Sequence, residues 1–137
     1  LSTVNSLSVD EWDDSYGNVW KSVIDNGALS IMAGHILQPA YSKHFNPELK
    51  NEEILPATLS KELLGDLLRD KLKFNGVIIT DATPMVGYNV AMSRKKAIPY
   101  SIAAGYDMIL FNKNIDEDYQ AVRDGLQDGT LTRKRLD

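Results

Sequence analysis

The stretch from Val77 to Gly87 constrains the fold more than any other part of the sequence. It opens with Val-Ile-Ile-Thr, four β-branched residues in a row, and such a run is typical of a buried strand. Pro84 and Gly87 then predict a turn that ends the strand. Asp81 therefore stands at the carboxyl end of a strand, where parallel α/β sheets bind ligands. A helix N-cap or an ordinary loop acid is the alternative for this residue.

Strand-like and helical segments alternate along the whole chain. Apolar runs at residues 28–36, 77–80 and 108–111 predict three strands, and the first is apolar enough to be buried on both faces of a sheet. No hairpin signal joins any two of them, which favours parallel strands with right-handed crossovers. At 137 residues the chain has the size of one ordinary domain. The predicted fold class is α/β.

The first helix is marked at both ends. Ser8 and Glu11 are spaced as a capping box, which predicts a helix that begins at Val9, and Gly27 supplies its stop. Apolar residues at helical spacing predict that one face of this helix is buried. That apolar stripe consists of Trp12, Tyr16, Val19, Trp20, Val23 and Ile24.

Three more helices follow a long connection. Residues 37–59 contain three prolines, and loops of this length are usually functional or mobile. Ser60 caps the second helix, which carries a stripe of leucines. The third spans residues 93–104, where Pro99 predicts a kink. The last spans about residues 115–126.

Composition excludes several functions. The net charge is −4 and the basic residues are scattered, so the chain has no nucleic-acid footprint. Two basic triplets, residues 94–96 and 133–135, are interpreted as solvated helix faces because no aromatic platform flanks them. No apolar run has membrane-spanning length, and the absence of cysteine excludes thiolate sites. We expect no metal and no cofactor, and localisation is left open.

Four blocks of sequence follow one another in a specific order. They are GALSIMAGHI from residue 27, LPATLS from residue 55, LLRDKLKFNGVIITDA from residue 67 and IAAGYDMIL from residue 102. Together they resemble the barrel domain of glycoside hydrolase family 3, and the resemblance is weakest over residues 39–53. It implies a (β/α)8 TIM barrel, which typically needs about 250 residues. We therefore expect residues 1–137 to be the C-terminal portion of such a barrel, with about three of its strands.

The resemblance implies a glycosidase that acts on β-N-acetylglucosaminides or β-glucosides. The family's nucleophile ends the Gly-Val-Ile-Ile-Thr-Asp type of block, which places it at Asp81. Retaining hydrolysis also needs a group that protonates the leaving oxygen and then activates water. The resemblance implies that this acid/base lies before Leu1 or beyond Asp137, so we expect the chain alone to be inactive.

His35 and Met85 are the two other site residues. His35 closes the first strand on the same side as Asp81, and the resemblance implies a substrate-pocket residue there; a core histidine bonded to a backbone carbonyl is the alternative. Met85 matches a family methionine beside the bound sugar, whereas an apolar filler under the loop is its alternative. Ala82 departs from the family pattern, where some members have a second Asp or a Trp, so the choice of sugar stays open.

The expected partners are a carbohydrate substrate and a second copy of the chain. Strands taken from a closed barrel leave unpaired edges, and helices that lack neighbours leave apolar surface in water. We therefore expect the isolated chain to associate with itself.

Two other classes of function stay open. In a receiver-type signalling domain, Asp81 would be the phosphoacceptor, and Lys113 would be the lysine that such domains have after a later strand. Phosphoryl transfer there needs Mg²⁺ held by an acidic pair after the first strand, where this sequence has Leu37-Gln38-Pro39. The other class is a non-catalytic module that binds a partner chain.

Overall fold

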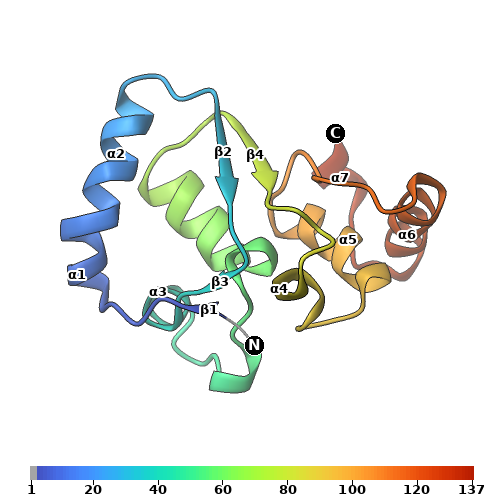
Figure 1. Ribbon diagram of the computed structural model, residues 1–137, viewed down its shortest axis with the longest axis horizontal. Coiled ribbons are helices and arrows are strands. Elements are labelled where there is room, and N and C mark those ends of the chain that lie inside the picture. The colour runs from blue at the N-terminus through green and yellow to red at the C-terminus, as the bar shows by residue number, and fades with distance from the viewer. Residues whose placement is uncertain (1–2) are drawn as a thin grey trace.

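Short parallel strands lie between helices in the computed structural model, which describes residues 3–137 (Figure 1). Strand β2 (Ser30–Ala33) pairs with β4 (Val77–Thr80), and β1 (Thr3–Val4) pairs with β3 (Ile36–Leu37). A further parallel bridge joins Ile79 to Met108. The predicted α/β class with parallel strands is confirmed. Two strand pairs and a bridge do not make a barrel, so the partial TIM barrel stays a prediction.

Three expectations about the strands are wrong. The run at residues 28–36 is divided between β2 and β3, which have different partners. Nor is β2 buried on both faces: Ile31 is 5% exposed, but the neighbouring Met32 is 49% exposed. Residues 108–111 form one bridge and no named strand. The ladder stops there because the Leu110 N–H donates to the Thr80 hydroxyl, at 2.8 Å, in place of a backbone carbonyl.

The first helical segment runs unbroken from α1 (Val9–Trp12) through the π-turn η1 (Asp13–Gly17) to α2 (Asn18–Asp25). Its predicted start is confirmed, since the Glu11 N–H donates to Ser8 Oγ and the Ser8 N–H donates to the Glu11 carboxylate. The predicted burial of its apolar stripe holds only in part. Trp12 is 4% exposed, whereas Tyr16 and Val19 are 54% and 62% exposed.

The long connection contains a helix that sequence reasoning missed. Helix α3 (Pro39–Phe45) is followed by two 3₁₀ turns, η2 (Asn51–Glu53) and η3 (Ala57–Leu59). A proline usually ends a helix, but Pro39 stands in the first turn, where its missing N–H has no partner to lose. Tyr41 is 1% exposed and meets Trp12 edge-on, with ring centroids 5.0 Å apart.

Three later helices lie close to their predicted positions: η4 (Glu62–Lys71), α5 (Arg94–Ala104) and α6 (Ile115–Asp128). Two short helices are additional, α4 (Val86–Asn89) and α7 (Arg133–Leu136), and α4 includes Gly87 of the predicted turn. The Ser60 cap is confirmed, because its hydroxyl accepts the Leu63 N–H. Gly105 and Gly129 end α5 and α6 with positive φ angles of 136° and 84°. The kink at Pro99 stays a prediction.

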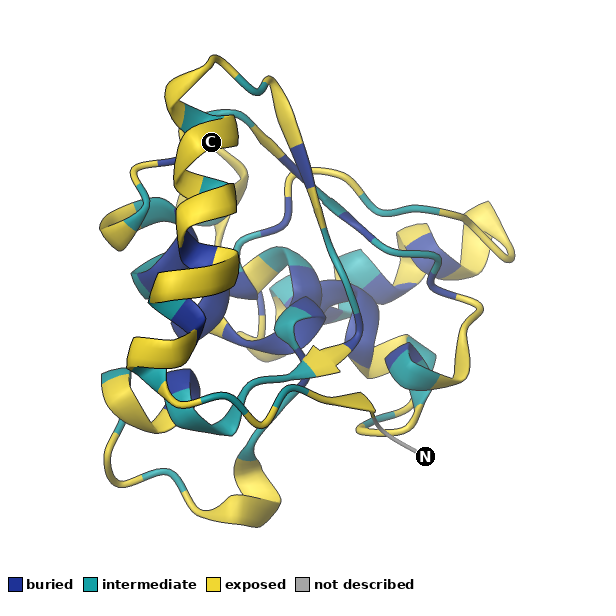
Figure 2. Cartoon of the chain, turned by 60° about the vertical axis from the view of Figure 1, so that its left-hand side comes forward, coloured by how far each residue is buried: buried dark blue, intermediate teal, exposed yellow. Residues whose placement is uncertain are grey.

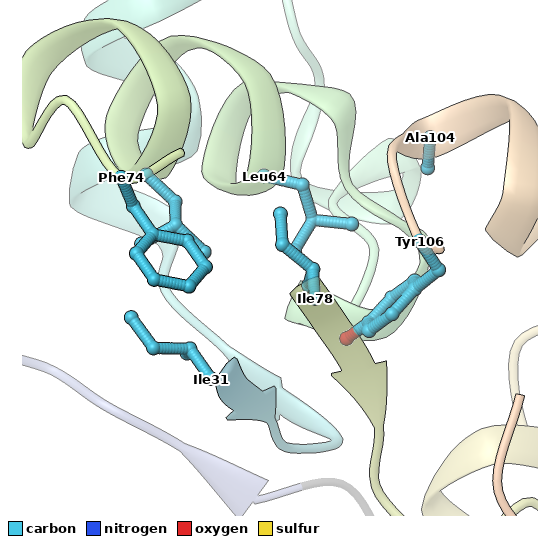
Figure 3. Close-up of a cluster of buried hydrophobic side chains, with 7 residues drawn as sticks. Ile31, Leu64, Phe74, Ile78, Ala104 and Tyr106 are labelled. Atoms are coloured by element: carbon cyan, nitrogen blue, oxygen red, sulfur yellow. The ribbon is translucent and has the colours of Figure 1, made fainter. Parts of the chain in front are cut away.

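The largest apolar cluster lies between the β2–β4 pair and η4 (Figure 3). Ile31 and Ile78 project from neighbouring strands, and Leu64, Phe74 and Tyr106 meet them from the surrounding elements. Buried residues gather where helices meet strands, and the outer helix faces are exposed (Figure 2). Across residues 3–137, no helix combines the length and apolar character needed to cross a membrane.

Asp107 holds the amino end of β4. Its carboxylate accepts hydrogen bonds from the Ile78 N–H at 2.9 Å, from Arg69 at 2.7 Å and from Arg135 at 3.1 Å. Arg135 is therefore an exception to the solvated basic face expected for residues 133–135.

We expect the isolated chain to self-associate through the free edge of β2. The Leu29 carbonyl accepts the Val77 N–H and the Ala33 carbonyl accepts the Asp81 N–H, so these residues face β4. Backbone groups alternate in direction along a strand, and those of Met32 therefore face the opposite edge. Light scattering should show a mass that rises with concentration. Met32→Lys should reduce this rise, whereas Leu136→Lys, at the same 49% exposure on α7, should not. A monomer at all concentrations would contradict the expectation.

Candidate active site

The carboxyl ends of β2 and β4 lie side by side. Ala33 pairs with Thr80, and the Asp81 N–H donates to the Ala33 carbonyl at 3.2 Å. The register therefore places Asp81, the residue after β4, beside Ala33 at the end of β2. His35 follows Ala33 by two positions. The two segments meet again where His35 Nε2 lies 3.1 Å from the Ala82 carbonyl oxygen. Asp81 and His35 thus belong to one edge, as their positions in the sequence predict.

The Asp81 side chain is partly exposed at this edge. One carboxylate oxygen, Oδ1, accepts the N–H of Ala82 at 2.7 Å. Within residues 3–137 this is the hydrogen bond that the structure records for the carboxylate. A carboxylate held by a single backbone N–H is one of the groups that can serve as a nucleophile.

His35 is 7% exposed and both of its ring nitrogens have partners. Nδ1 lies 2.7 Å from the Thr58 hydroxyl, and Nε2 lies 3.1 Å from the Ala82 carbonyl. Because a carbonyl only accepts, Nε2 carries the proton, and in the neutral ring Nδ1 accepts from Thr58. These contacts match the alternative of a core histidine bonded to a backbone carbonyl. They also fasten the residue after Asp81 to the end of β2.

Met85 ends the turn that follows Asp81. Its N–H donates to the Ala82 carbonyl at 3.0 Å, and its side chain is 47% exposed. Two residues on, Gly87 allows α4 to approach the segment after β2 closely, because a Cβ there would stand 2.8 Å from the His35 Cβ. The sequence shows Gly87 as part of a turn, but only the structure shows this close packing.

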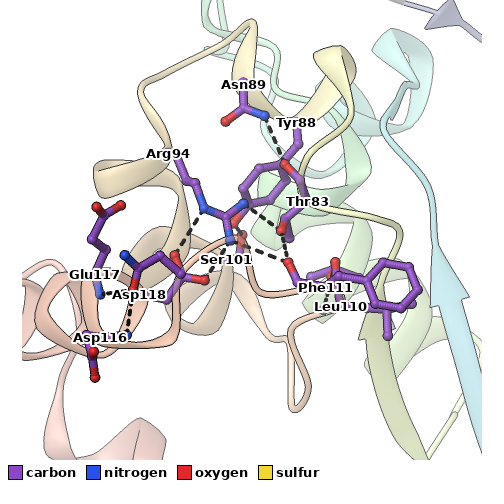
Figure 4. A network of polar contacts seen from close by, with 12 residues as sticks. Thr83, Tyr88, Asn89, Arg94, Ser101, Leu110, Phe111, Asp116, Glu117 and Asp118 are labelled. Carbon is purple, nitrogen blue, oxygen red and sulfur yellow. Dashed lines mark hydrogen bonds and ion pairs between the residues drawn. The ribbon is translucent and has the colours of Figure 1, made fainter.

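Arg94 joins three segments next to this turn (Figure 4). Its Nη1 donates to the Thr83 hydroxyl at 2.6 Å, its Nη2 donates to the Phe111 carbonyl at 3.4 Å, and Nε and Nη2 bind both oxygens of Asp118. The Arg94 and Asp118 side chains are 18% and 9% exposed. The interpretation of residues 94–96 as a solvated face is therefore wrong for Arg94. Its two lysine neighbours offered no sequence signal that distinguished it.

Two buried tyrosines, Tyr88 and Tyr106, pack next to the carboxyl ends of β2 and β4. Tyr106 donates from its hydroxyl to the Ala33 carbonyl at 3.0 Å, and Tyr88 lies 2.8 Å from the Ser101 hydroxyl. Burial raises the pKa of Tyr88 to about 12. Burial also raises the pKa of Tyr106, with the charge of Asp81 adding to the effect. Both phenols therefore stay protonated at neutral pH and serve as neutral hydrogen-bonding groups.

A large cleft lies elsewhere. It has a volume of about 570 Å³ and is lined by the N-terminal segment, the first helix, β2 and η4, without Asp81, His35 or Met85. Its walls are mainly apolar, with Trp12 and the leucines of η4 among them. As for metals, residues 3–137 hold no cluster of three or more His, Cys, Asp or Glu side chains able to bind an ion.

Fold and site together define an α/β domain that presents a partly exposed carboxylate at the carboxyl end of a parallel strand. The model of the glycosyl hydrolase family 3 N terminal domain matches residues 3–137, and the chain belongs to this family. A beta-N-acetylglucosaminidase/beta-glucosidase of Cellulomonas fimi is 48% identical over all 137 residues, which cover 24% of that protein. A beta-hexosaminidase of Chromobacterium violaceum is 35% identical over 63% of the chain and 21% of its own length.

Solved structures show the same likeness. The beta-glucoside phosphorylase BglX, solved with 2FGlc bound, is 48% identical over 99% of this chain and 24% of its own, with a TM-score of 0.96. CbsA from Thermotoga neapolitana is 26% identical over 99% of this chain and 30% of its own, with a TM-score of 0.84. The chain spans about a quarter of the length of the C. fimi relative.

Replacing His35 should destabilise the fold. His35→Ala removes a buried ring and one hydrogen bond each from the Thr58 hydroxyl and the Ala82 carbonyl, and we expect the free energy of unfolding to fall by about 1–3 kcal/mol. Urea denaturation of the purified chain measures this loss. The control is His44→Ala, since His44 is exposed on α3 and should change the stability by less than about 0.5 kcal/mol. Equal stability of the two variants would show that the His35 contacts contribute nothing.

Proposed function

We propose that this domain carries the nucleophile of a retaining β-glycosidase that acts on β-N-acetylglucosaminides or β-glucosides. The observation that supports the proposal most is the Asp81 carboxylate, partly exposed at the carboxyl end of β4, in a chain 48% identical to the C. fimi enzyme along its whole length. Membership of glycosyl hydrolase family 3 removes the receiver-type alternative. A non-catalytic module becomes one outcome of the tests below.

In the proposed reaction, an Asp81 oxygen attacks the anomeric carbon as the bond to the leaving oxygen breaks. The leaving oxygen takes a proton from an acid, and a glycosyl–aspartate ester forms. Water then attacks the same carbon, gives its proton to that group and releases Asp81 as a carboxylate. The acid/base is proposed to lie outside residues 1–137. In support, His35 is engaged at both ring nitrogens, and His44 lies on α3 beside Tyr41 and Phe45.

His35 and Met85 are proposed to shape the sugar subsite. The Met85 side chain is 47% exposed and follows Asp81 by one turn, so its thioether can contact the apolar face of a sugar. His35 lies behind Ala82 and is proposed to act on the pocket wall through the bond to that carbonyl. His35→Ala should then lower kcat/KM by an amount equivalent to about 1–3 kcal/mol, beyond its effect on stability.

Phosphorolysis is the second candidate. The observation that favours it is the likeness to the beta-glucoside phosphorylase BglX, which is as high as 48% identity with a TM-score of 0.96. In that case phosphate in place of water attacks the anomeric carbon of the ester. Its oxygen forms the new C–O bond, Asp81 leaves as a carboxylate, and the product is a glycosyl phosphate.

Asp81→Asn should abolish turnover in the protein at its full native length. An amide is a very weak nucleophile, so kcat should fall by several orders of magnitude while the fold is kept. A 2-fluoro-glycoside with a good leaving group should label Asp81 in the wild type, as peptide mass spectrometry detects. The control is Asp70→Asn, because Asp70 is exposed on η4.

Labelling at another residue, or a variant that keeps most of its kcat, would contradict the assignment. Absence of both labelling and turnover in the full-length protein would favour the non-catalytic module. The 137-residue chain by itself should not hydrolyse aryl β-glycosides, because loss of general acid help commonly costs about 10²–10⁴-fold. Measurable turnover by this chain would place the acid/base within it.

Phosphate should distinguish the two candidate reactions. With an aryl β-glucoside and millimolar phosphate, chromatography of the products should show mainly glucosyl phosphate if phosphorolysis is the activity. Sulfate at the same ionic strength is the control, because it matches the charge of phosphate and gives no stable product. Free sugar alone, in unchanged yield with either anion, would leave hydrolysis as the function.

A further inference from the structure

The backbone around Asp81 is held on both sides. Before it, the Thr80 hydroxyl donates to the Leu110 carbonyl at 3.1 Å and accepts the Leu110 N–H at 2.8 Å. After it, Thr83 is fully buried at 0% exposure. Thr80 and Thr83, on either side of Asp81, both hydrogen-bond to the segment that contains Leu110 and Phe111. The carboxylate itself stays outside this set of contacts.

Every polar group of Thr83 is used. Its N–H donates to the Leu110 carbonyl at 2.7 Å, and its carbonyl accepts from Asn89 Nδ2 at 2.9 Å. Its hydroxyl donates to the Phe111 carbonyl at 2.5 Å and accepts from Arg94 Nη1 at 2.6 Å. Because that hydroxyl has its single proton on Phe111, the cation is the donor it needs. Arg94 therefore completes the set of bonds around Thr83.

The charge of Arg94 is balanced by Asp118 and not by Asp81. Nε and Nη2 bind Asp118 at 3.0 and 2.6 Å, in the two-pronged geometry that suits a guanidinium and a carboxylate. Asp118 projects from α6, so the pair also connects the Asp81 turn to that helix. Because Asp118 balances the charge of Arg94, Arg94 affects the turn through its hydrogen bond to the Thr83 hydroxyl.

We propose that Arg94 is a positioning residue for Asp81 and acts through the Thr83 hydroxyl. The inference rests on the proposed nucleophilic role of Asp81. Attack on a sugar requires the carboxylate oxygen within near-contact of the anomeric carbon, and a misplacement of about 1 Å can cost roughly 10²-fold in rate. Only Ala82 separates Asp81 from Thr83, so a Thr83 that is free to move lets the carboxylate move with it.

A matched pair at Thr83 tests the link. Thr83→Val keeps the shape and removes the hydroxyl, whereas Thr83→Ser keeps the hydroxyl. In the full-length protein, Thr83→Val should slow 2-fluoro-glycoside labelling of Asp81 and lower kcat by roughly 10–100-fold, with KM changed by less than about threefold. Thr83→Ser should restore most of the rate. A merely structural role would lower the amount of folded enzyme without this difference in kcat of the folded fraction.

Arg94→Lys provides the second pair. Lysine keeps the charge but not the fork, so it cannot reach Thr83 and both Asp118 oxygens together, and we expect the same loss of kcat as for Thr83→Val. The double variant Arg94→Leu/Asp118→Leu removes both buried charges and should fold, because apolar replacement of a buried ion pair is often neutral. It should also lose kcat, since it too leaves Thr83 without its donor.

Amide hydrogen exchange gives a readout that does not depend on activity. Peptides that cover residues 80–85 should exchange faster in Thr83→Val and Arg94→Lys than in wild type or Thr83→Ser. Wild-type labelling and exchange rates in both variants would overturn the proposal and leave the role of Asp81 intact. A wild type that is never labelled at Asp81 would overturn the proposed function, and the positioning role with it.

Discussion

The register of β2 against β4 is the constraint on which the rest of the structure depends. Ile31 pairs with Ile78, and both project into the cluster against η4. A slip of one residue would turn these side chains to the opposite face and leave that cluster unfilled. The same register places Ala33 beside Thr80, and so the Asp81 N–H against the Ala33 carbonyl. Core packing therefore sets the place of the carboxylate.

The polar side chains of Thr80, Thr83 and Tyr106, next to the carboxyl ends of β2 and β4, are buried, and each has a hydrogen-bond partner. An unsatisfied buried donor or acceptor costs about 1–3 kcal/mol, so this set of side chains tolerates few alternative arrangements. Thr80, Thr83 and Tyr106 direct their hydroxyls to backbone carbonyls of the segments they face. Hydrogen bonding thus restrains the strand ends, while the Asp81 carboxylate keeps an oxygen free for a ligand. Restraint of this kind is what the proposed catalytic role of Asp81 needs, because preorganised groups do not have to rearrange during the reaction.

Buried charge plays a different part in this domain. The Arg94–Asp118 pair, at 18% and 9% side-chain exposure, is costly to desolvate, so the pair is weak evidence for a gain in stability. It connects α5 and α6 to the turn after β4. The pairs of Asp107 with Arg69 and Arg135 are about one-third exposed and anchor the amino end of the same strand. Together they hold β4 at both ends.

The strand at Val77–Thr80, the capping box at Ser8 and the resemblance that leads to Asp81 could all be predicted from the sequence, because these features depend on neighbours along the chain. Three other features became visible in the folded chain alone: Pro39 begins a helix, His35 bonds to Ala82, and Arg94, one of three consecutive basic residues, is largely buried. Those outcomes depend on residues far apart in sequence: His35 and Thr58 are 23 positions apart, and Arg94 and Asp118 are 24. Local patterns carry no information about which distant partner a polar side chain will meet.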